Sequence, residues 1–290
     1  NLNDEDCYLP KSTSLRVSRL GYYSEEQDEN FITFNTLEGY LETIKDYINI
    51  PNDKFKDISL DLKQQVNNGT IQMESELYNH IRPKGVISKD IRPYNQLNEN
   101  GIEYLEIRSI DLNPYSAIGI SMEDIEFLEL VSLYCALSDA PKINDVESLC
   151  IKENIRRSSE SGQNCNFISS LDGDKAEAPA DVITNSFLGE LEDFAKMIGL
   201  SKEKKKMFEE FFQRNTTTLS MKFIEDVEKS GGVLPLVLEK SVHTKRNIDD
   251  KNLSLFKKER ELSEKEYLKE KNEDKILFED YLEAFRGEIK

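Results

Sequence analysis

The chain has 290 residues, 38% of them hydrophobic, which is enough to form a sizeable core. Its formal net charge of −18 argues against partners such as nucleic-acid phosphates or an anionic membrane surface. No apolar run is long enough to cross a bilayer, and the four cysteines lack metal-ligand spacing. These features predict a soluble, reduced protein of the cytoplasm, with no nucleic-acid and no membrane partner.

The first predicted elements are a strand and a helix. Residues 31–35 have the composition of a short strand, and residues 37–48 have the 3.6-residue periodicity of an amphipathic helix. The apolar positions of this helix are Leu37, Tyr40, Leu41, Ile44, Tyr47 and Ile48. Pro51 follows it, as expected beyond a helix end.

A turn and a second strand are predicted next. Residues 67–69 (NNG) are typical of a turn, and the alternation over residues 70–78 predicts a strand. The side chains expected on one side of this strand are Ile71, Met73, Ser75 and Leu77. Residues 84–100 are predicted to form a loop with scattered polar side chains.

Residues 101–114 (GIEYLEIRSIDLNP) contain the most informative pattern of the chain. Their period of two predicts a strand with Glu106 and Arg108 on one face. Leu105 and Ile107 are expected to be buried on the other face. Such a strand can hold a metal ion beside a phosphate, because Mg²⁺ prefers carboxylate oxygen and arginine matches phosphate geometry. The alternative is a solvated face with a surface ion pair.

From Ser121 onward the pattern is helical. Ser121 is a capping residue ahead of a helix that ends before Pro141, and this apolar helix is expected to be buried with Cys135 as a small hydrophobe. A helix at 146–158 and a loop at 161–180 follow. Further helices are predicted at 181–198, 201–214, 217–229, 233–241 and 254–286, the last with a bend or break near Asn272.

Several motifs together carry a family resemblance. They are TSLRVSRLGY (13–22), ELYNHIRPK (76–84), GIEYLEIRS (101–109), DLNP (111–114), FLEL (127–130) and CALSDAP (135–141). In order and approximate spacing they resemble bacterial glutamate-cysteine ligase of the γ-proteobacterial type. The resemblance is strong over about residues 8 to 141.

The resemblance implies an α+β fold. Residues 1–120 are expected to form part of a glutamine-synthetase-like antiparallel sheet, and residues 121–290 a largely α-helical region packed on it. The chain begins with Asn1 and enters a family motif directly, so it is interpreted as the carboxyl-terminal portion of the enzyme. On this interpretation the missing amino-terminal portion is required, because it supplies other metal ligands and part of the sheet, and the fragment alone is inactive.

The resemblance also implies a reaction. Family members join the γ-carboxyl of L-glutamate to the amine of L-cysteine, the first step of glutathione biosynthesis, with ATP driving the reaction through an acyl-phosphate. The resemblance implies Mg²⁺ or Mn²⁺ as the metal cofactor of this reaction. By motif position Glu106 corresponds to a metal ligand, and Arg108 to a catalytic arginine that faces the transferring phosphoryl group of ATP. Arg82 and Lys84 are candidates for binding the ATP phosphates, with a surface turn as the equal alternative.

Substrate binding is implied for three further residues. Arg16 matches the arginine of the first motif, and Tyr22 and Tyr78 match tyrosines expected to bind the cysteine carboxylate. An arginine fork and a tyrosine hydroxyl both suit a carboxylate. The alternative for the tyrosines is ordinary core packing.

Other kinds of site are excluded or disfavoured. The chain has no GxxxxGK[ST] and no GxGxxG motif, which excludes a P-loop or Rossmann nucleotide site. His80 and His243 lack partners at catalytic spacing, so a capping or solvent-facing role is expected. Two other functions stay open: a non-catalytic helical interaction protein derived from the ligase, and a related glutamate-amine ligase.

Overall fold

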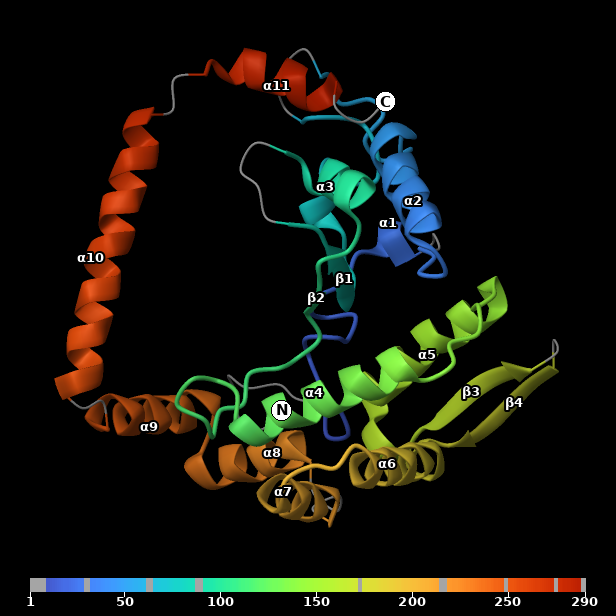
Figure 1. The fold of residues 1–290 in the computed structure, drawn as a ribbon, viewed down its shortest axis with the longest axis vertical. Coiled ribbons are helices and arrows are strands. Elements are labelled where there is room, and N and C mark those ends of the chain that lie inside the picture. Colours follow the sequence, from blue (N-terminus) through green and yellow to red (C-terminus); the bar gives the residue numbers. More distant parts are fainter. Residues whose placement is uncertain are drawn as a thin grey trace. The chain divides into compact units, whose positions relative to one another are not determined.

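The computed structural model describes residues 9–28, 32–60, 65–86, 91–171, 174–213, 218–247, 250–273 and 276–287. These residues form mostly helices, with two small two-stranded sheets (Figure 1). In chain order the elements are α1 (Glu25–Asp28), α2 (Leu37–Asn49), η1 (Glu74–Glu76), β1 (Ile81–Lys84), α3 (Pro93–Asn100), β2 (Tyr104–Ile107), α4 (Met122–Leu137), α5 (Asp145–Ser161), η2 (Gly162–Asn164), β3 (Asn166–Leu171), β4 (Asp174–Pro179), α6 (Ala180–Met197), α7 (Lys202–Gln213), α8 (Leu219–Ser230), α9 (Val233–Arg246), α10 (Asp250–Glu273) and α11 (Phe278–Gly287). None of the described helices has both the length and the apolar character needed to span a membrane.

The chain divides into two compact units, each made of three segments. The first unit comprises Asn1–Gly39, Tyr78–Arg82 and Leu105–Val237. The second comprises Tyr40–Leu77, Pro83–Tyr104 and Leu238–Lys290. The predicted domain boundary after residue 120 stays a prediction.

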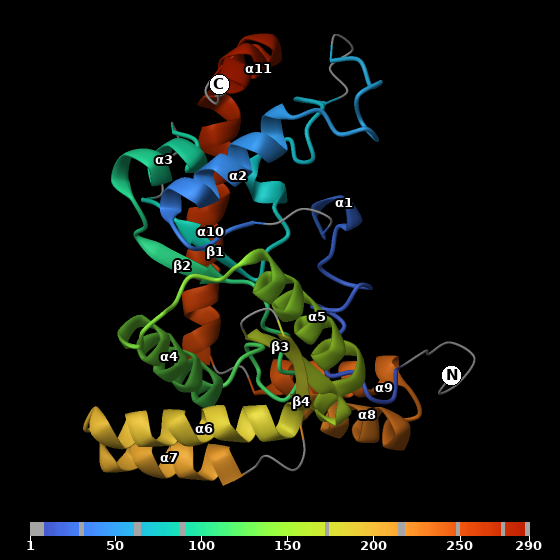
Figure 2. The same cartoon turned by 90° about the vertical axis from the view of Figure 1, so that its right-hand side faces the viewer.

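The core of the first unit is built by α4, α6 and α7, and Figure 2 shows α6 and α7 side by side. Its buried members are Leu130, Leu191, Phe194, Ala195 and Phe208. Tyr134 of α4 meets the edges of Phe187 and Phe194 with ring centroids 5.7 and 5.5 Å apart. Edge-to-face contacts of this kind add to the stabilisation that burial provides.

Helix α4 begins as predicted but is not buried. Ser121 and Asp124 form a reciprocal capping box at its start. Met122 and Leu137 are 67% and 72% exposed, and Cys135 is exposed as well. The prediction of a buried helix with a buried Cys135 was therefore wrong. The helix packs on α6 and α7 with one face only, whereas its apolar residues lie all around it.

Residues 161–180 are not the predicted loop. They contain the antiparallel hairpin of β3 and β4, in which Asn166 lies opposite Pro179 and Leu171 opposite Asp174. The hairpin lies along α5 (Figures 1 and 2). The Asn154 side chain of α5 donates to the carbonyl of Ile168 and accepts from its N–H, both at 2.7 Å. These two bonds give partners to the backbone N–H and carbonyl of Ile168 at the outer edge of β3.

The second unit has its core around α2, whose predicted periodicity is confirmed. Tyr40, Leu41, Ile44, Tyr47 and Ile48 are buried. Helix α11 is held by Arg286, whose guanidinium donates to the carbonyls of residues 60, 65 and 66. Arg92 donates to the carbonyl of Phe285 at 2.8 Å and lies over its ring.

Three predictions for the first hundred residues were wrong. The predicted strand at 31–35 is irregular where it is described, and residue 31 lies outside the described residues. The predicted strand at 70–78 contains the 3₁₀ turn η1 instead, because the Glu74 carboxylate binds Arg92 and the N–H of Tyr94. The predicted loop at 84–100 contains α3.

The other helices were predicted well. Helix α5 has a capping box formed by Asn144 and Glu147. Helices α6, α7 and α8 agree with the predicted ranges within a few residues, and α9 is longer than predicted. The chain leaves α10 at Glu273, close to the break expected near Asn272, and re-enters a helix at Phe278.

Candidate active site

The candidate site is centred on two stacked tyrosines of the first unit. The rings of Tyr22 and Tyr78 have centroids 4.5 Å apart and planes 29° apart. They line an open pocket of about 670 Å³, a volume typical of small-molecule sites. The other lining residues are Leu9, Leu15, Arg16, Leu20 and Gly21.

The segment that carries Tyr22 is folded tightly on itself. The N–H of Tyr22 donates to the carbonyl of Arg16 at 2.6 Å, and the N–H of Gly21 donates to the carbonyl of Ser18. A Cβ at position 21 would lie 2.2 Å from the carbonyl oxygen of Leu15, so only glycine fits there. The glycine of the first motif therefore has a steric reason, and its position beside Tyr22 is the sequence signal for this turn.

Three arginines surround Tyr22. Arg82 is 3% exposed, and its Nη2 donates to the Tyr22 hydroxyl at 2.6 Å. The guanidinium carbons of Arg108 and Arg16 lie 5.1 and 5.6 Å from the centre of the Tyr22 ring. These are cation–π distances, and the arrangement concentrates positive charge around Tyr22 in an otherwise acidic chain. It suits an anionic ligand such as a carboxylate or a phosphate.

The strand pair β1 and β2 brings the charged residues to the site. The N–H of Arg108 donates to the carbonyl of His80, and the N–H of Glu103 donates to the carbonyl of Lys84, so the two strands are antiparallel. Arg16 Nε donates to the carbonyl of Arg108 at 2.6 Å. The segment before Tyr22 is thereby tied to the end of β2.

Glu106 and Arg108 share a face, as the strand pattern predicted. Arg108 Nη1 lies 3.6 Å from Glu106 Oε1, and both side chains are about one-third exposed. The expected burial of Leu105 and Ile107 was wrong, since they are 60% and 37% exposed. The described residues give this sheet only two strands, and a pair of strands buries little on either face.

The remaining predicted residues are placed as follows. Arg82 is not on a surface turn, because it is buried against Tyr22. Lys84 ends β1 and belongs to the second unit, so its role toward ATP stays a prediction. His80 is half-buried, and burial lowers its pKa. His243 is exposed and bonded to Asn247 at 2.8 Å.

A metal ion is implied by the family resemblance, and Glu106 is the residue that fits it. A carboxylate that is partly exposed beside an arginine can contribute to Mg²⁺, which usually takes one or two protein carboxylates together with phosphate oxygens. In the described ranges no three His, Cys, Asp or Glu side chains lie close enough to hold a metal ion by themselves. The role of Glu106 as a metal ligand stays a prediction.

Sequence reasoning missed two features of the site. One is the bond from Arg82 to Tyr22, which needs residues 60 positions apart to meet. The other is the contact between the loop of residues 9–22 and the end of α5, in which Arg19 pairs with Glu160 at 3.1 Å. Neither feature has a local signal in the sequence.

Comparison with known proteins identifies the family. A family model described as glutamate-cysteine ligase matches residues 1–158. The glutamate-cysteine ligase of Wigglesworthia glossinidia brevipalpis is 36% identical over 288 residues, which cover 92% of this chain and 56% of that protein. The enzyme of Yersinia pseudotuberculosis is 30% identical and covers 97% of this chain and 57% of its own length. The chain thus spans a little over half the length of these curated relatives.

A solved structure agrees with this assignment. The crystal structure of glutamate-cysteine ligase from Francisella tularensis in complex with AMP superposes with a TM-score of 0.82 at 25% identity. The match covers 95% of this chain and 57% of that one. The predicted α+β class, with part of a glutamine-synthetase-like antiparallel sheet and a largely helical region, is confirmed by this likeness. By sequence and by fold, the chain belongs to the glutamate-cysteine ligase family.

Proposed function

We propose that this chain provides part of the active site of an ATP-dependent ligase that joins the γ-carboxyl of glutamate to the amine of cysteine. The observation that carries the proposal is the Tyr22–Tyr78 pair, with Arg82 bonded to the Tyr22 hydroxyl and two further guanidinium groups beside its ring. The membership in the ligase family supports the reaction type. In this reaction the glutamate carboxylate takes the terminal phosphoryl group of ATP, ADP leaves, and the cysteine amine then displaces phosphate from the acyl-phosphate.

The pocket is assigned to cysteine. Tyr22 and Tyr78 present hydroxyl donors, and Arg16 offers a charged fork that also lines the pocket. Arg82 orients the Tyr22 hydroxyl by donating to its oxygen, and a tyrosine hydroxyl that accepts one hydrogen bond can also donate one. Leu9, Leu15 and Leu20 make the rest of the wall apolar, which suits a small uncharged side chain.

Arg108 and Glu106 are assigned to the phosphoryl group and the metal. Phosphoryl transfer depends mainly on positioning and on neutralising charge, so a guanidinium close to a metal-binding carboxylate meets its requirements. Glu106 would hold Mg²⁺, or Mn²⁺, which neutralises charge on the ATP phosphates when bound. Arg108 is oriented by its contacts with Glu106 and the Tyr22 ring, and it would donate to the transferring phosphoryl oxygens. Lys84 is a further candidate for the ATP phosphates.

The activity is assigned to this chain together with other residues. The chain spans 56–57% of the length of its matched relatives, and the residues that the structure describes hold no cluster of three metal-binding side chains. We therefore infer that the 290 residues alone do not complete the reaction. A cytoplasmic location is proposed as well, since Cys135, Cys150 and Cys165 are free thiols.

The direct test uses the complete protein that carries this chain, supplied with ATP, Mg²⁺, L-glutamate and L-cysteine. We expect γ-glutamylcysteine to form with one ADP released per product, and no product when the 290 residues are assayed alone. Omitting cysteine and supplying other amines tests the alternative of a related glutamate-amine ligase. ADP release and product formation that do not depend on cysteine would overturn the proposal.

A further inference from the structure

The loop that lines most of the pocket rests on the carboxyl-terminal end of α5. This loop, residues 9–22, is here called the pocket loop. Thr13 Oγ1 donates to the carbonyl of Ser158 at 2.7 Å, and Ser12 Oγ donates to the carbonyl of Ser159 at 2.7 Å. The N–H of Thr13 donates to the same Ser159 carbonyl at 2.9 Å. The N–H of Ser14 adds a longer bond of 3.5 Å to the Ser159 carbonyl, so four hydrogen bonds join two segments that are 145 to 147 positions apart in the sequence.

The chemistry of a helix end explains why the contact forms here. The last carbonyls of an α-helix have no partner within the helix, so they are acceptors that need donors from elsewhere. The pocket loop supplies such donors to the carbonyl of Ser159, and Thr13 adds a second donor to the carbonyl of Ser158, which also accepts the N–H of Gly162. Gly162 ends the helix with a φ of 63°, and a Cβ there would lie 2.7 Å from the carbonyl oxygen of Lys11. A glycine is therefore required for the loop to approach the helix end.

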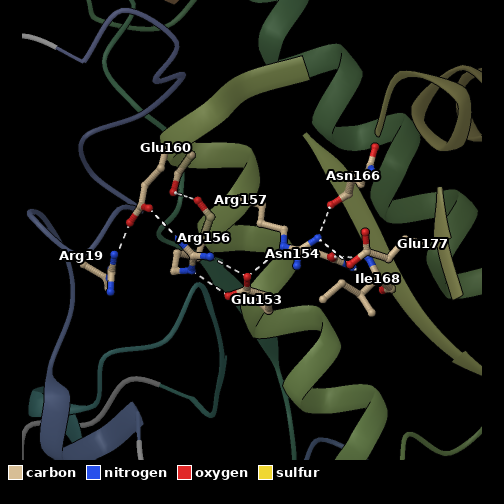
Figure 3. A network of polar contacts seen from close by, with 10 residues as sticks. Arg19, Glu153, Asn154, Arg156, Arg157, Glu160, Asn166, Ile168 and Glu177 are labelled. Carbon is tan, nitrogen blue, oxygen red and sulfur yellow. Dashed lines mark hydrogen bonds and ion pairs between the residues drawn. The ribbon is translucent and has the colours of Figure 1, made fainter. Parts of the chain in front are cut away.

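A chain of ion pairs extends the same contact along α5. Arg19 of the pocket loop pairs with Glu160 at 3.1 Å, and Arg156 donates to the other oxygen of Glu160 at 2.8 Å (Figure 3). Glu153 then binds both Arg156 and Arg157. Arg157 reaches Glu177 of the hairpin at 3.3 Å, at the far end of the network (Figure 3). The Arg19 end of the network thus belongs to the pocket loop, whereas the Glu177 end belongs to the hairpin.

We propose that the carboxyl-terminal end of α5 is a positioning element for the pocket, with Thr13 and Glu160 as positioning residues that set the affinity for the amino-acid substrate. Neither residue lines the pocket itself. They hold the pocket loop, whose other end places Arg16 on the carbonyl of Arg108 and stacks Tyr22 on Tyr78. The proposal rests on the proposed function for the identity of the substrate, but the placement of Tyr22 can be measured without it.

The expected effect falls on binding more than on turnover. The pocket loop carries the side chains assigned to cysteine, whereas Arg108 and Glu106 are carried by the β2 segment. A loop that samples other positions presents the binding geometry for a smaller fraction of the time, and the apparent Kd rises in inverse proportion to that fraction. Loss of one such hydrogen bond corresponds to a change of about threefold to tenfold.

The kinetic test compares four variants in the complete protein that carries this chain. Thr13→Val removes the hydroxyl without changing the side-chain shape, and Thr13→Ser keeps the hydroxyl. We expect Thr13→Val to raise KM for cysteine about threefold to tenfold with kcat changed less than about twofold, and Thr13→Ser to restore KM. Glu160→Gln should raise KM in the same direction, more at low salt than at high salt. Glu177→Gln removes a carboxylate from the same network away from the loop and should leave KM unchanged.

A second measurement reports the position of Tyr22 directly. With 3-fluorotyrosine placed at position 22, the ¹⁹F resonance should shift or broaden in Thr13→Val and Glu160→Gln, and should be unchanged in Thr13→Ser and Glu177→Gln. If the wild-type protein makes no γ-glutamylcysteine while this resonance responds, the proposed function fails and the positioning role stands. If the resonance is unchanged in both Thr13→Val and Glu160→Gln, the positioning role fails. A Thr13→Ser variant as impaired as Thr13→Val would also overturn it.

Discussion

Arg82 donates a hydrogen bond to the hydroxyl of Tyr22 at 2.6 Å, although the two residues are 60 positions apart. The bond joins β1 to the pocket loop inside the first unit. Arg82 is only 3% exposed, and burying its charge is costly unless polar contacts of this kind compensate for the lost hydration. The pair therefore couples the stability of the fold to the orientation of a tyrosine assigned to substrate binding.

Replacing Arg82 with lysine should destabilise the protein. A lysine keeps the charge but loses the planar fork, so the bond to Tyr22 is lost or distorted, and we expect the free energy of unfolding to fall by about 1–3 kcal/mol. Arg260→Lys is the matched control, because Arg260 is 78% exposed on α10 and should change stability by less than about 0.5 kcal/mol. Urea unfolding followed by circular dichroism measures both. Equal stability of the two variants would show that the Tyr22 contact contributes nothing.

Replacing Arg108 with lysine should lower turnover. The planar guanidinium is assigned to the transferring phosphoryl group, and losing one such group reduces kcat on the order of 10²-fold. KM for ATP should change less, since other groups also bind the nucleotide. Steady-state kinetics on the complete protein checks this, with the exposed Arg246→Lys as the control. An Arg108→Lys variant with wild-type kcat would remove Arg108 from the phosphoryl site.

The core of α4, α6 and α7 predicts a contrast between two leucines. Leu191 is fully buried, so Leu191→Ala should lower the free energy of unfolding by about 2–5 kcal/mol through lost burial and a cavity. Leu137 is 72% exposed on α4, and Leu137→Ala should cost less than about 0.5 kcal/mol. Thermal and urea unfolding give both values. Similar losses at the two positions would contradict the one-sided packing of α4.

The α5 network predicts a dependence of stability on pH. Hydrogen bonds from Arg156, with further help from Arg157, lower the pKa of Glu153 from 4.5 to about 2. Because the folded-state pKa is the lower one, Glu153 stabilises the fold above pH 4.5, and this contribution is lost as the pH falls toward 2. The stability difference between wild type and Glu153→Gln should therefore be largest above pH 4.5 and shrink toward pH 2. Unfolding curves across this range test it, and a difference that grows on acidification would contradict the assignment.

Local signals predicted the helices well, and the reason is physical. Periodic apolar residues identify α2, and capping residues mark the starts of α4 and α5, because both signals arise within one element. Helix α3 also carries a local signal of a helix start. Pro93 stands at its first turn, where a missing N–H costs nothing.

The features that could not be predicted from the sequence are those that form through contacts between distant parts of the chain. The hairpin of β3 and β4 has few apolar residues, and Asn154 of α5 supplies bonds to the backbone of Ile168 that no local pattern announces. The segment at 70–78 alternates like a strand, yet the Glu74–Arg92 ion pair is formed at a 3₁₀ turn there. Ile71 and Leu77, which the alternation placed on one side, are both buried, whereas Ser75 of the same set is exposed.

In the candidate site, too, the local patterns could be predicted from the sequence and the long-range contacts could not. The period-two pattern of a strand was enough to place Glu106 beside Arg108. The family motifs identified Arg16, Tyr22 and Tyr78 as candidate residues, and all three line the pocket. The stack of the two tyrosines joins positions 22 and 78, which only the folded chain brings together.

The cysteine assignment of the pocket is tested most directly by Tyr22→Phe and Tyr78→Phe in the complete protein that carries this chain. Each change removes one hydroxyl and keeps the ring, so the stack can persist while a donor to the substrate carboxylate is lost. Tyr267→Phe, in an exposed ring of α10, is the matched control. We predict that both pocket variants raise KM for cysteine about tenfold, while KM for glutamate stays near its wild-type value and the control changes neither. Equal increases for glutamate and cysteine, or no increase for cysteine, would contradict the assignment of this pocket.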